Sequence, residues 1–471
     1  MKKNFTLFIV VLFGVSSHAA ETNTPSFAQT NTSSRLLRPL SLAEALDLAL
    51  QQNSAIRKSR ADLEATYGVI VQTRAIAWPK VGVSSSYSAN EDSSTDKFMA
   101  KGGGSTNSFI ANAFEFANQR WSADIRVTQS IYEGGKINSA LRTARLTREQ
   151  ALLSHQTIIA DTLRDMRVAY YDVLLAQQQI LVQEASLKLL QQELDETTKR
   201  QQAGTVPRFN VLRAEVEVAN AQPKLIRAQN AFRTAKDVLA NLLGENIPPG
   251  TDELPLQLTD KLDAAPYNVQ LSAAIAQAFE QRSELAALRK TEALRNENVI
   301  NAKAGYKPSV QVFAGYGTKS SQFSQDLTEE LHGWEAGAQL SWNVFDGFLT
   351  KGRIEEAEGL RKRTQEDLAD TMRRVELDVR VAYSSFIEAQ SVLRSQEKVQ
   401  ESAEEALRLA NARAGAGTAT QLDVLNAQTS LTEARSTQVQ ALHDYAVARA
   451  KLERAIGQPI QSTTNRVSQP K

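Results

Sequence analysis

The 471-residue sequence predicts a mixed α and β fold, in which long antiparallel coiled-coil helices and four short strands are shared between two equivalent halves. Three observations support this prediction. Short motifs occur twice at a constant offset along the chain. Apolar residues recur at every seventh position through long stretches, which is typical of coiled coils. Four short segments alternate between apolar and polar residues, which is typical of strands.

The internal duplication determines how the chain is divided. Arg167-Val-Ala-Tyr170 returns as Arg380-Val-Ala-Tyr383, an offset of 213 residues. Upstream, Pro79 matches Pro308 at an offset of 229 residues, so the first copy holds 16 extra residues within the range 87–121. The predicted segments are a secretory signal peptide at 1–20, a first repeat at 40–244, a linker in the equatorial region at 245–270, a second repeat at 271–457 and a polar C-terminal tail at 458–471.

Each repeat is expected to hold one amphipathic helix before its strands and one long helical hairpin after them. The first helices are predicted over 41–77 and 271–304, and each ends at a proline. No glycine or proline interrupts residues 138–202, which predicts a rod of about 100 Å. Gly204 and Gly417 suit the left-handed position after a helix, and the threonine that follows each is expected to cap the next helix.

The heptad rows of the hairpins place large side chains opposite small ones, which lets two helices approach closely. The large row of the first hairpin is Leu152, Ile159, Met166, Val173, Ile180, Leu187 and Leu194. In the second hairpin the large row is Met372, Val379, Phe386 and Leu393, and the small row is Ala427, Ala434, Ala441, Ala448 and Ala455.

The alternating segments at 81–90, 121–132, 310–318 and 334–345 leave two interpretations open. Such strands can form a soluble antiparallel sheet with its polar side in water. They can also belong to a membrane barrel with an apolar exterior and a polar interior. Four strands cannot close a barrel, because about eight are needed, so the membrane interpretation requires several copies of the chain.

Composition excludes several classes of function. A net charge of +1 gives no electrostatic basis for binding nucleic acid. The sequence has no cysteine and only four scattered histidines, which argues against thiol catalysis, disulfides and cysteine-based metal sites. No catalytic constellation was found, so we expect neither an enzyme nor a bound cofactor or metal.

These motifs resemble the TolC family of outer-membrane channel-tunnels over about residues 40–457. The resemblance rests on the duplicated order of Tyr132-Glu-Gly-Gly135 and Phe345-Asp-Gly347, the Gly-Thr turns, and Thr418-Ala-Thr-Gln-Leu-Asp-Val-Leu425. It implies a homotrimer in the cell outer membrane, in which each protomer gives four transmembrane strands to one 12-stranded β-barrel. The helices would then form a periplasmic α-barrel. The strand face expected to meet outer-membrane lipid contains Trp121, Ile125, Val127, Trp334, Leu340 and Trp342.

The resemblance also implies export without chemistry. An inner-membrane pump or ABC-type secretion transporter would supply the energy, and a periplasmic adaptor protein would join it to the helical tips. The channel would passively conduct drugs, other small molecules or secreted protein. The alternative is a soluble periplasmic coiled-coil scaffold without a pore.

Two groups of residues at the hairpin turns are candidate sites under this resemblance. The expected adaptor contacts are Gly204, Thr205, Val206, Gly417 and Thr418. The pore constriction candidates are Asp423, Asn210, Arg208 and Arg413. Asp423 has a second interpretation, as an acidic residue favoured at a helix start by the helix dipole.

Overall fold

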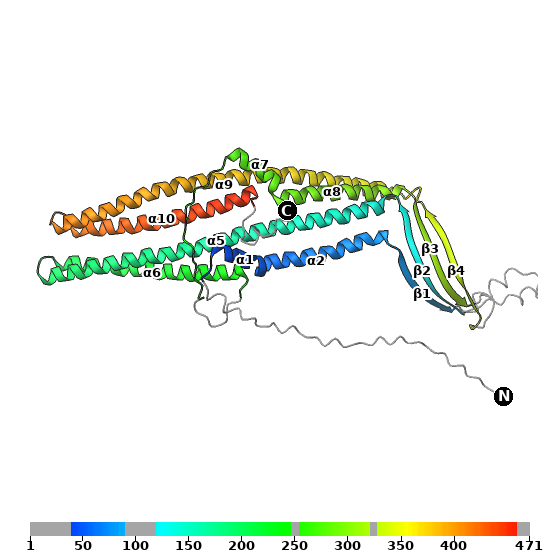
Figure 1. Cartoon of the computed structure of the whole chain (residues 1–471), viewed down its shortest axis with the longest axis horizontal. Helices are drawn as coiled ribbons and strands as arrows, with labels where there is room; N and C mark the ends of the chain where they lie inside the picture. Colours follow the sequence, from blue (N-terminus) through cyan, green and yellow to red (C-terminus); the bar gives the residue numbers. More distant parts are fainter. Residues whose placement is uncertain (1–38, 90–118, 246–253, 321–326, 459–471) are drawn as a thin grey trace, which may run out of the picture.

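The protein is elongated, with a layer of long helices that ends in a curved sheet (Figure 1). The computed structural model describes residues 39–89, 119–245, 254–320 and 327–458. The predicted signal peptide, the inserted segment beyond residue 89 and the tail beyond residue 458 lie outside the described residues.

The two repeats have the same order of elements. The first contains α1 (Leu42–Gln52), α2 (Ser54–Arg74), η2 (Ala75–Ala77), β1 (Lys80–Ala89), β2 (Gln119–Glu133), α5 (Lys136–Gln202) and α6 (Arg208–Leu243). The second contains α7 (Leu271–Gln281), α8 (Ser283–Lys303), η3 (Ala304–Tyr306), β3 (Ser309–Ser320), β4 (Glu330–Ser341), α9 (Leu349–Gly415) and α10 (Gln421–Ile456). The long helices α5 and α9 both have 67 residues, and the returning helices α6 and α10 both have 36. The duplication read from the sequence is therefore confirmed.

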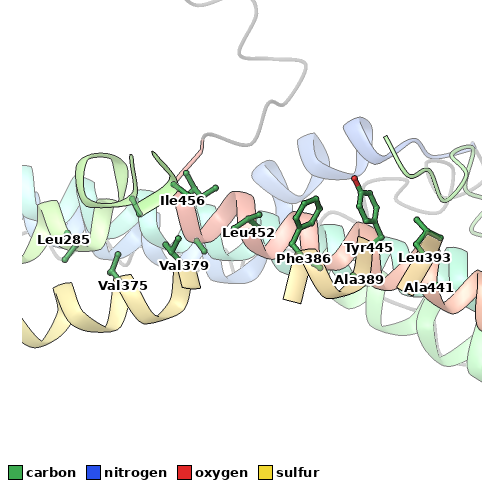
Figure 2. Packing of buried hydrophobic residues seen from close by; sticks show 14 residues of the cluster. Leu285, Val375, Val379, Phe386, Ala389, Leu393, Ala441, Tyr445, Leu452 and Ile456 are labelled. Atoms are coloured by element: carbon green, nitrogen blue, oxygen red, sulfur yellow. The ribbon is translucent and has the colours of Figure 1, made fainter. Parts of the chain in front are cut away.

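Each hairpin is held together by the predicted row of large side chains against small ones. In the second hairpin, Val379, Phe386 and Leu393 are buried against the alanine row of α10 (Figure 2). The Phe386 ring also lies 5.3 Å from the Tyr445 ring and 5.8 Å from the Tyr267 ring, measured between centroids. Alanine opposite these rings leaves the volume they need, since core side chains interdigitate at high density.

The helices form a single layer rather than a bundle. In the half distant from the sheet, the neighbours are α6, α5, α10 and α9, in that order (Figure 1). In the half nearer the sheet, the order is α2, α5, α8 and α9. Within one chain, α9 is therefore one edge of the layer along its whole length, and α6 and α2 form the other.

The linker crosses the helices at the level of α1 and α7. Its described part begins with the buried residues Leu254 and Leu256, and Leu258 forms a parallel bridge with Leu40. Farther along, the backbone oxygen of Ala265 accepts a 2.8 Å hydrogen bond from the Tyr445 hydroxyl. The linker thus contacts both repeats.

The expected helices at 41–77 and 271–304 are each broken into two, and the breaks occupy equivalent positions. Asn53 ends α1, accepts hydrogen bonds from the first amides of α2, and donates from Nδ2 to the Leu242 backbone oxygen at 2.6 Å. Arg282 ends α7, and its Nε donates to the Ala455 backbone oxygen at 2.8 Å. Each break residue therefore satisfies a carbonyl at the end of the returning helix, where intrahelical partners are missing.

The seam between α5 and α10 joins the two repeats and is polar, unlike the seams within the hairpins. His443 on α10 is 8% exposed, and its Nε2 lies 2.7 Å from Asp172 Oδ1 on α5. Its Nδ1 lies 3.0 Å from Asp444 Oδ1. Both ring nitrogens face carboxylate acceptors, so the arrangement fits the doubly protonated ring. Further pairs on this seam are Asp161–Arg454, Arg167–Glu453, Gln179–Ser436 and Ser186–Thr432.

The His443 contact predicts a pH dependence of stability. Burial alone lowers the pKa of His443, but the hydrogen bonds to Asp172 and Asp444 outweigh burial and raise it. A raised pKa in the folded state means that the stabilisation is fully present below about pH 6.5, the ordinary pKa of histidine, and is lost as pH rises through the folded value. We expect the thermal unfolding midpoint to fall over that range.

Replacement of the ring isolates this effect. His443→Gln should lower stability by about 1.5–3 kcal/mol at pH 6, the size of a hydrogen bond to a charged group, and should flatten the pH profile. His332→Gln, at the exposed His332 of β4, is the matched control and should keep the profile of the unmodified protein. A His443→Gln profile as steep as that of the unmodified protein would exclude His443 as the source.

Candidate functional sites on the sheet and at the helical tips

The four strands form one antiparallel sheet in the order β1-β2-β3-β4, with β1 and β4 at its edges. The register carries a row of side chains across every strand: Val83 lies beside Ile125, Ile125 beside Tyr316, and Tyr316 beside Trp334. Because directly paired residues point to the same side, this row lies on one face. A bulge between Ser130 and Tyr132 shifts the register of β2 near its end.

The face that carries this row is apolar and open. Trp334 is 80% exposed, Val83 76% and Leu340 67%. No described residue of the chain covers this face as a protein core would. Ile125 and Val127 also lie on it and are exposed.

Trp121 and Trp342, two of the predicted lipid-facing residues, differ from the others because their indole N–H groups donate hydrogen bonds to backbone oxygens. Trp121 is only partly exposed, and its indole Nε1 donates to the Leu327 backbone oxygen at 3.0 Å. Trp342 lies one residue beyond β4, because that strand ends at Ser341 rather than near residue 345. The Trp342 Nε1 donates to the Tyr306 backbone oxygen at 3.1 Å, which holds the indole at the junction between sheet and helices.

The opposite face of the sheet is polar. Ser84 donates to Asp124 at 2.6 Å, and Ser86 lies 2.8 Å from Ser122. Arg126 forms an ion pair with Glu335 and lies 4.9 Å above the Phe313 ring centroid. Sequence reasoning missed this pair, because the two residues belong to different repeats and only the register of β3 brings them together.

The hairpin turns match the predicted glycine conformation but not the predicted caps. Gly204 has φ of 75° and Gly417 has φ of 71°, in the left-handed region. The hydroxyl of Thr205 donates back to the Arg200 carbonyl at 2.8 Å, and that of Thr418 donates back to the Arg413 carbonyl at 3.1 Å. Both threonines therefore close the preceding helix instead of capping the next one, since a helix C-terminus has carbonyls without partners.

Asp423 is part of the true cap of α10. Its backbone N–H donates to the Thr420 hydroxyl at 3.3 Å, and its carboxylate accepts from the Thr420 backbone N–H at 2.8 Å. Hydrogen bonds from the Thr420 backbone and side chain lower the pKa of Asp423, and the charge of Arg413 adds to the effect. Asp423 is thus an exposed, charged group whose position is fixed by the start of the helix.

A groove of about 730 Å³ separates the tips of the two hairpins. Val206 and Asn210 line it from the first hairpin, and Gln421 lines it from the second. Asp423, Arg208 and Arg413 are not among its lining residues, so one chain does not bring the four constriction candidates together.

Gln421 bridges this groove, a contact that sequence reasoning also missed. Its Nε2 donates to Thr197 Oγ1 at 2.6 Å and to Glu193 Oε1 at 3.3 Å. Burial raises the pKa of Glu193, whereas the hydrogen bonds from Gln421 and Thr197 oppose that rise. The side-chain amide of Gln421 on α10 therefore joins the tips of the two repeats, because it donates to the Thr197 hydroxyl and the Glu193 carboxylate on α5.

No group of three or more histidine, aspartate or glutamate side chains in the described ranges could hold a metal ion. Among the helices of the described ranges, none has both the length and the apolar character needed to cross a membrane.

Comparison with known proteins gives relatives that extend over most of the chain. The chain is 24% identical to outer membrane protein TolC of Vibrio cholerae, with 88% of this chain and 90% of that protein aligned. It is 24% identical to TolC of Escherichia coli, with 92% and 86% aligned. The crystal structure of the Campylobacter jejuni CmeC outer membrane channel superposes with a TM-score of 0.74 at 14% identity, covering 90% of this chain and 88% of CmeC.

A family match extends over both repeats. The family described as outer membrane efflux protein matches residues 45–245 and 274–458, which is nearly the whole of both repeats. This family match does not favour the alternative of a soluble periplasmic coiled-coil scaffold without a pore. The chain therefore belongs to the outer membrane efflux protein family, as an export channel of the outer membrane with a helical part in the periplasm.

Proposed function

We propose that three copies of the chain close into one tube that conducts exported molecules across the outer membrane. The observation that carries this proposal is that the single chain is an open wall with two free edges. In the sheet these edges are β1 and β4, and an unpaired strand edge is a template for another strand. A second and a third copy would pair each edge and close the sheet into a 12-stranded β-barrel.

The helical layer supports the same closure. On α6, Val216, Ile226 and Val238 are exposed in the single chain, and they extend from near the tip to the height of Val381 on α9. On α9, at the other edge of the layer, Leu377 and Val381 are exposed one turn apart, and Val392 and Val399 follow in heptad register. Exposed apolar rows of this kind mark interaction surfaces, and packing α9 of one copy against α6 of the next would bury both.

The closed tube would act as a passive conduit. Family members are channel proteins rather than enzymes, and we infer that this chain likewise performs no catalysis. An inner-membrane pump or ABC-type secretion transporter would provide the energy, and the tube would carry drugs, other small molecules or secreted protein. A periplasmic adaptor would contact the tips, for which the exposed turn residues offer the surface. Gly204, Thr205, Gly417 and Thr418 are exposed there, and Val206 is half-buried beside them.

The constriction would be built by the trimer rather than by one chain. Asp423 is exposed, ionised and fixed at a helix start, so threefold symmetry would repeat its carboxylate in a ring. Asn210, Arg208 and Arg413 would contribute from the same level of the tips. Rings of carboxylates favour cations in channels, so we assign cation selectivity to Asp423.

Closure through the helical edges is tested by charged substitutions. Val381→Glu combined with Val392→Glu would place two carboxylates in the proposed seam between copies, so the detergent-solubilised protein should shift from trimer to monomer. Light scattering after size-exclusion chromatography measures the mass. Glu388→Gln, at an exposed position between them, is the control and should remain trimeric. A trimer that survives the double substitution would exclude this seam.

The lipid-facing assignment is tested on the sheet. Ile125→Arg should destabilise the folded protein in lipid vesicles by about 2–4 kcal/mol, the cost of arginine near the middle of the lipid-facing surface. Gln339→Arg on the polar face should cost less than about 1 kcal/mol, because that face would line water. Urea unfolding in vesicles measures both, and equal costs on the two faces would contradict the assignment.

The role of Asp423 is tested by removing its charge while keeping its cap. Asp423→Asn retains an oxygen that accepts from the Thr420 backbone N–H, so α10 should still begin at the same residue. Planar-bilayer recordings should show reduced cation selectivity and weaker block by multivalent cations. Thr420→Ala weakens the cap without changing charge and should keep the selectivity of the unmodified channel. If the two variants behave alike, selectivity does not depend on the carboxylate.

A further inference from the structure

A basic groove of about 410 Å³ lies between the last turns of α8 and the first turns of α9, next to the sheet. Three cationic side chains line it, one from each of three helices: Lys136 of α5, Arg295 of α8 and Arg353 of α9. Glu356 is the only acidic residue among its lining residues, so the groove has a surplus of positive charge. Asn298 and Asn301 add amide groups that can donate hydrogen bonds.

The three cationic side chains lack the carboxylate partners that neighbouring cationic side chains have. On the same helices, Arg142 lies 2.7 Å from Glu297, Lys303 lies 3.1 Å from Glu358, and Arg361 lies 3.2 Å from Glu292. Within the described part of the chain, Lys136, Arg295 and Arg353 make no such ion pair. Moreover, Arg295 Nε is closed off from solvent and has no hydrogen-bond acceptor among the described residues.

An unsatisfied donor of this kind needs an explanation, because a buried polar group without a hydrogen-bond partner destabilises the fold. The start of α5 adds to the same local charge. Lys136 is its first residue, and Gly135 at the N-cap offers no side chain to satisfy the first amides. A helix N-terminus carries partial positive charge and favours anions. The groove is therefore built for a ligand with negative charge and several acceptor oxygens.

The position of the groove identifies where such a ligand would come from. The sheet ends beside it, and Trp78, Tyr306 and Trp342 are exposed at this junction. Exposed tryptophan and tyrosine are enriched where a membrane surface meets water. Arg353 is the fifth residue of α9, so it lies about 6 Å along the helix from its first residue. The headgroup region of a bilayer is about 5–7 Å thick on each side, which matches this depth.

We propose that this groove binds a phosphate group, supplied by an anionic phospholipid of the periplasmic leaflet. Lys136 and Arg353 would contact the phosphate oxygens at headgroup depth. Arg295, farther from the sheet, would add a third positive charge to the groove. Basic pockets between helices at a membrane surface recognise lipid headgroups in this way. The bound lipid would fix the junction between sheet and helices, a role separate from the gate and the tips.

Native mass spectrometry of the detergent-solubilised full chain, titrated with dioleoylphosphatidylglycerol, tests the site. The variant Lys136→Gln/Arg353→Gln should bind this lipid about tenfold more weakly or worse, since two charge-assisted hydrogen-bond donors are lost. Lys362→Gln replaces an exposed lysine on α9 outside the groove and should bind like the unmodified protein. Glu356→Gln removes the only acidic lining group and should bind the lipid more tightly.

Inorganic phosphate, titrated by calorimetry, distinguishes the two sources of the ligand. Weaker phosphate binding in the double variant, with lipid binding unchanged, would keep the anion site but assign it to free phosphate. If the double substitution weakens neither ligand, the proposal is overturned. If the double variant does not fold, the Glu356→Gln variant alone tests the proposal. Tighter binding of either ligand would support the site, and unchanged binding of both would refute it.

Discussion

The close contact of large side chains with alanine inside each helical hairpin is the constraint on which the rest of the structure depends. Phe386 and Val379 fit against α10 only because alanine recurs opposite them at heptad spacing. The same seam holds α5 and α9 as continuous helices about 100 Å long. It also leaves one face of α6 and of α9 without a partner, so a stable hairpin produces a wall with free apolar edges.

The seam between α5 and α10, which joins the two repeats, differs in its contacts from the seams within the hairpins. Along α5 and α10 most side-chain contacts are hydrogen bonds and ion pairs such as Asp172–His443 and Thr197–Gln421, and Leu190 and Leu425 add a small apolar cluster. Net hydrogen bonds contribute only about 1 kcal/mol each, whereas burial of a large apolar side chain contributes about 1.5–3 kcal/mol. The two hairpins are therefore stiff units joined along a weaker seam.

The sequence predicted the features that depend on local pattern and missed those that depend on distant contacts. Heptads and the glycines Gly204 and Gly417 located the hairpins to within a few residues. Asn53 is a residue type favoured at helix starts and caps α2 locally, but its second partner, a carbonyl on α6, is distant in the sequence. Phe348 occupies the position of Gly135 in the other repeat and has φ of 67°, a conformation that costs phenylalanine about 1–3 kcal/mol. The basic groove combines three helices, so spacing along the chain could not reveal it.

On the proposed function, one chain is a third of a closed tube through the outer membrane. Electron cryomicroscopy of the protein in lipid nanodiscs tests it most directly. We expect a threefold particle in which β1 pairs with β4 of the next copy, α6 packs against α9 of the next copy, and the apolar strand face meets lipid. A folded chain whose sheet stays open, or whose apolar strand face is covered by protein instead of lipid, would contradict it.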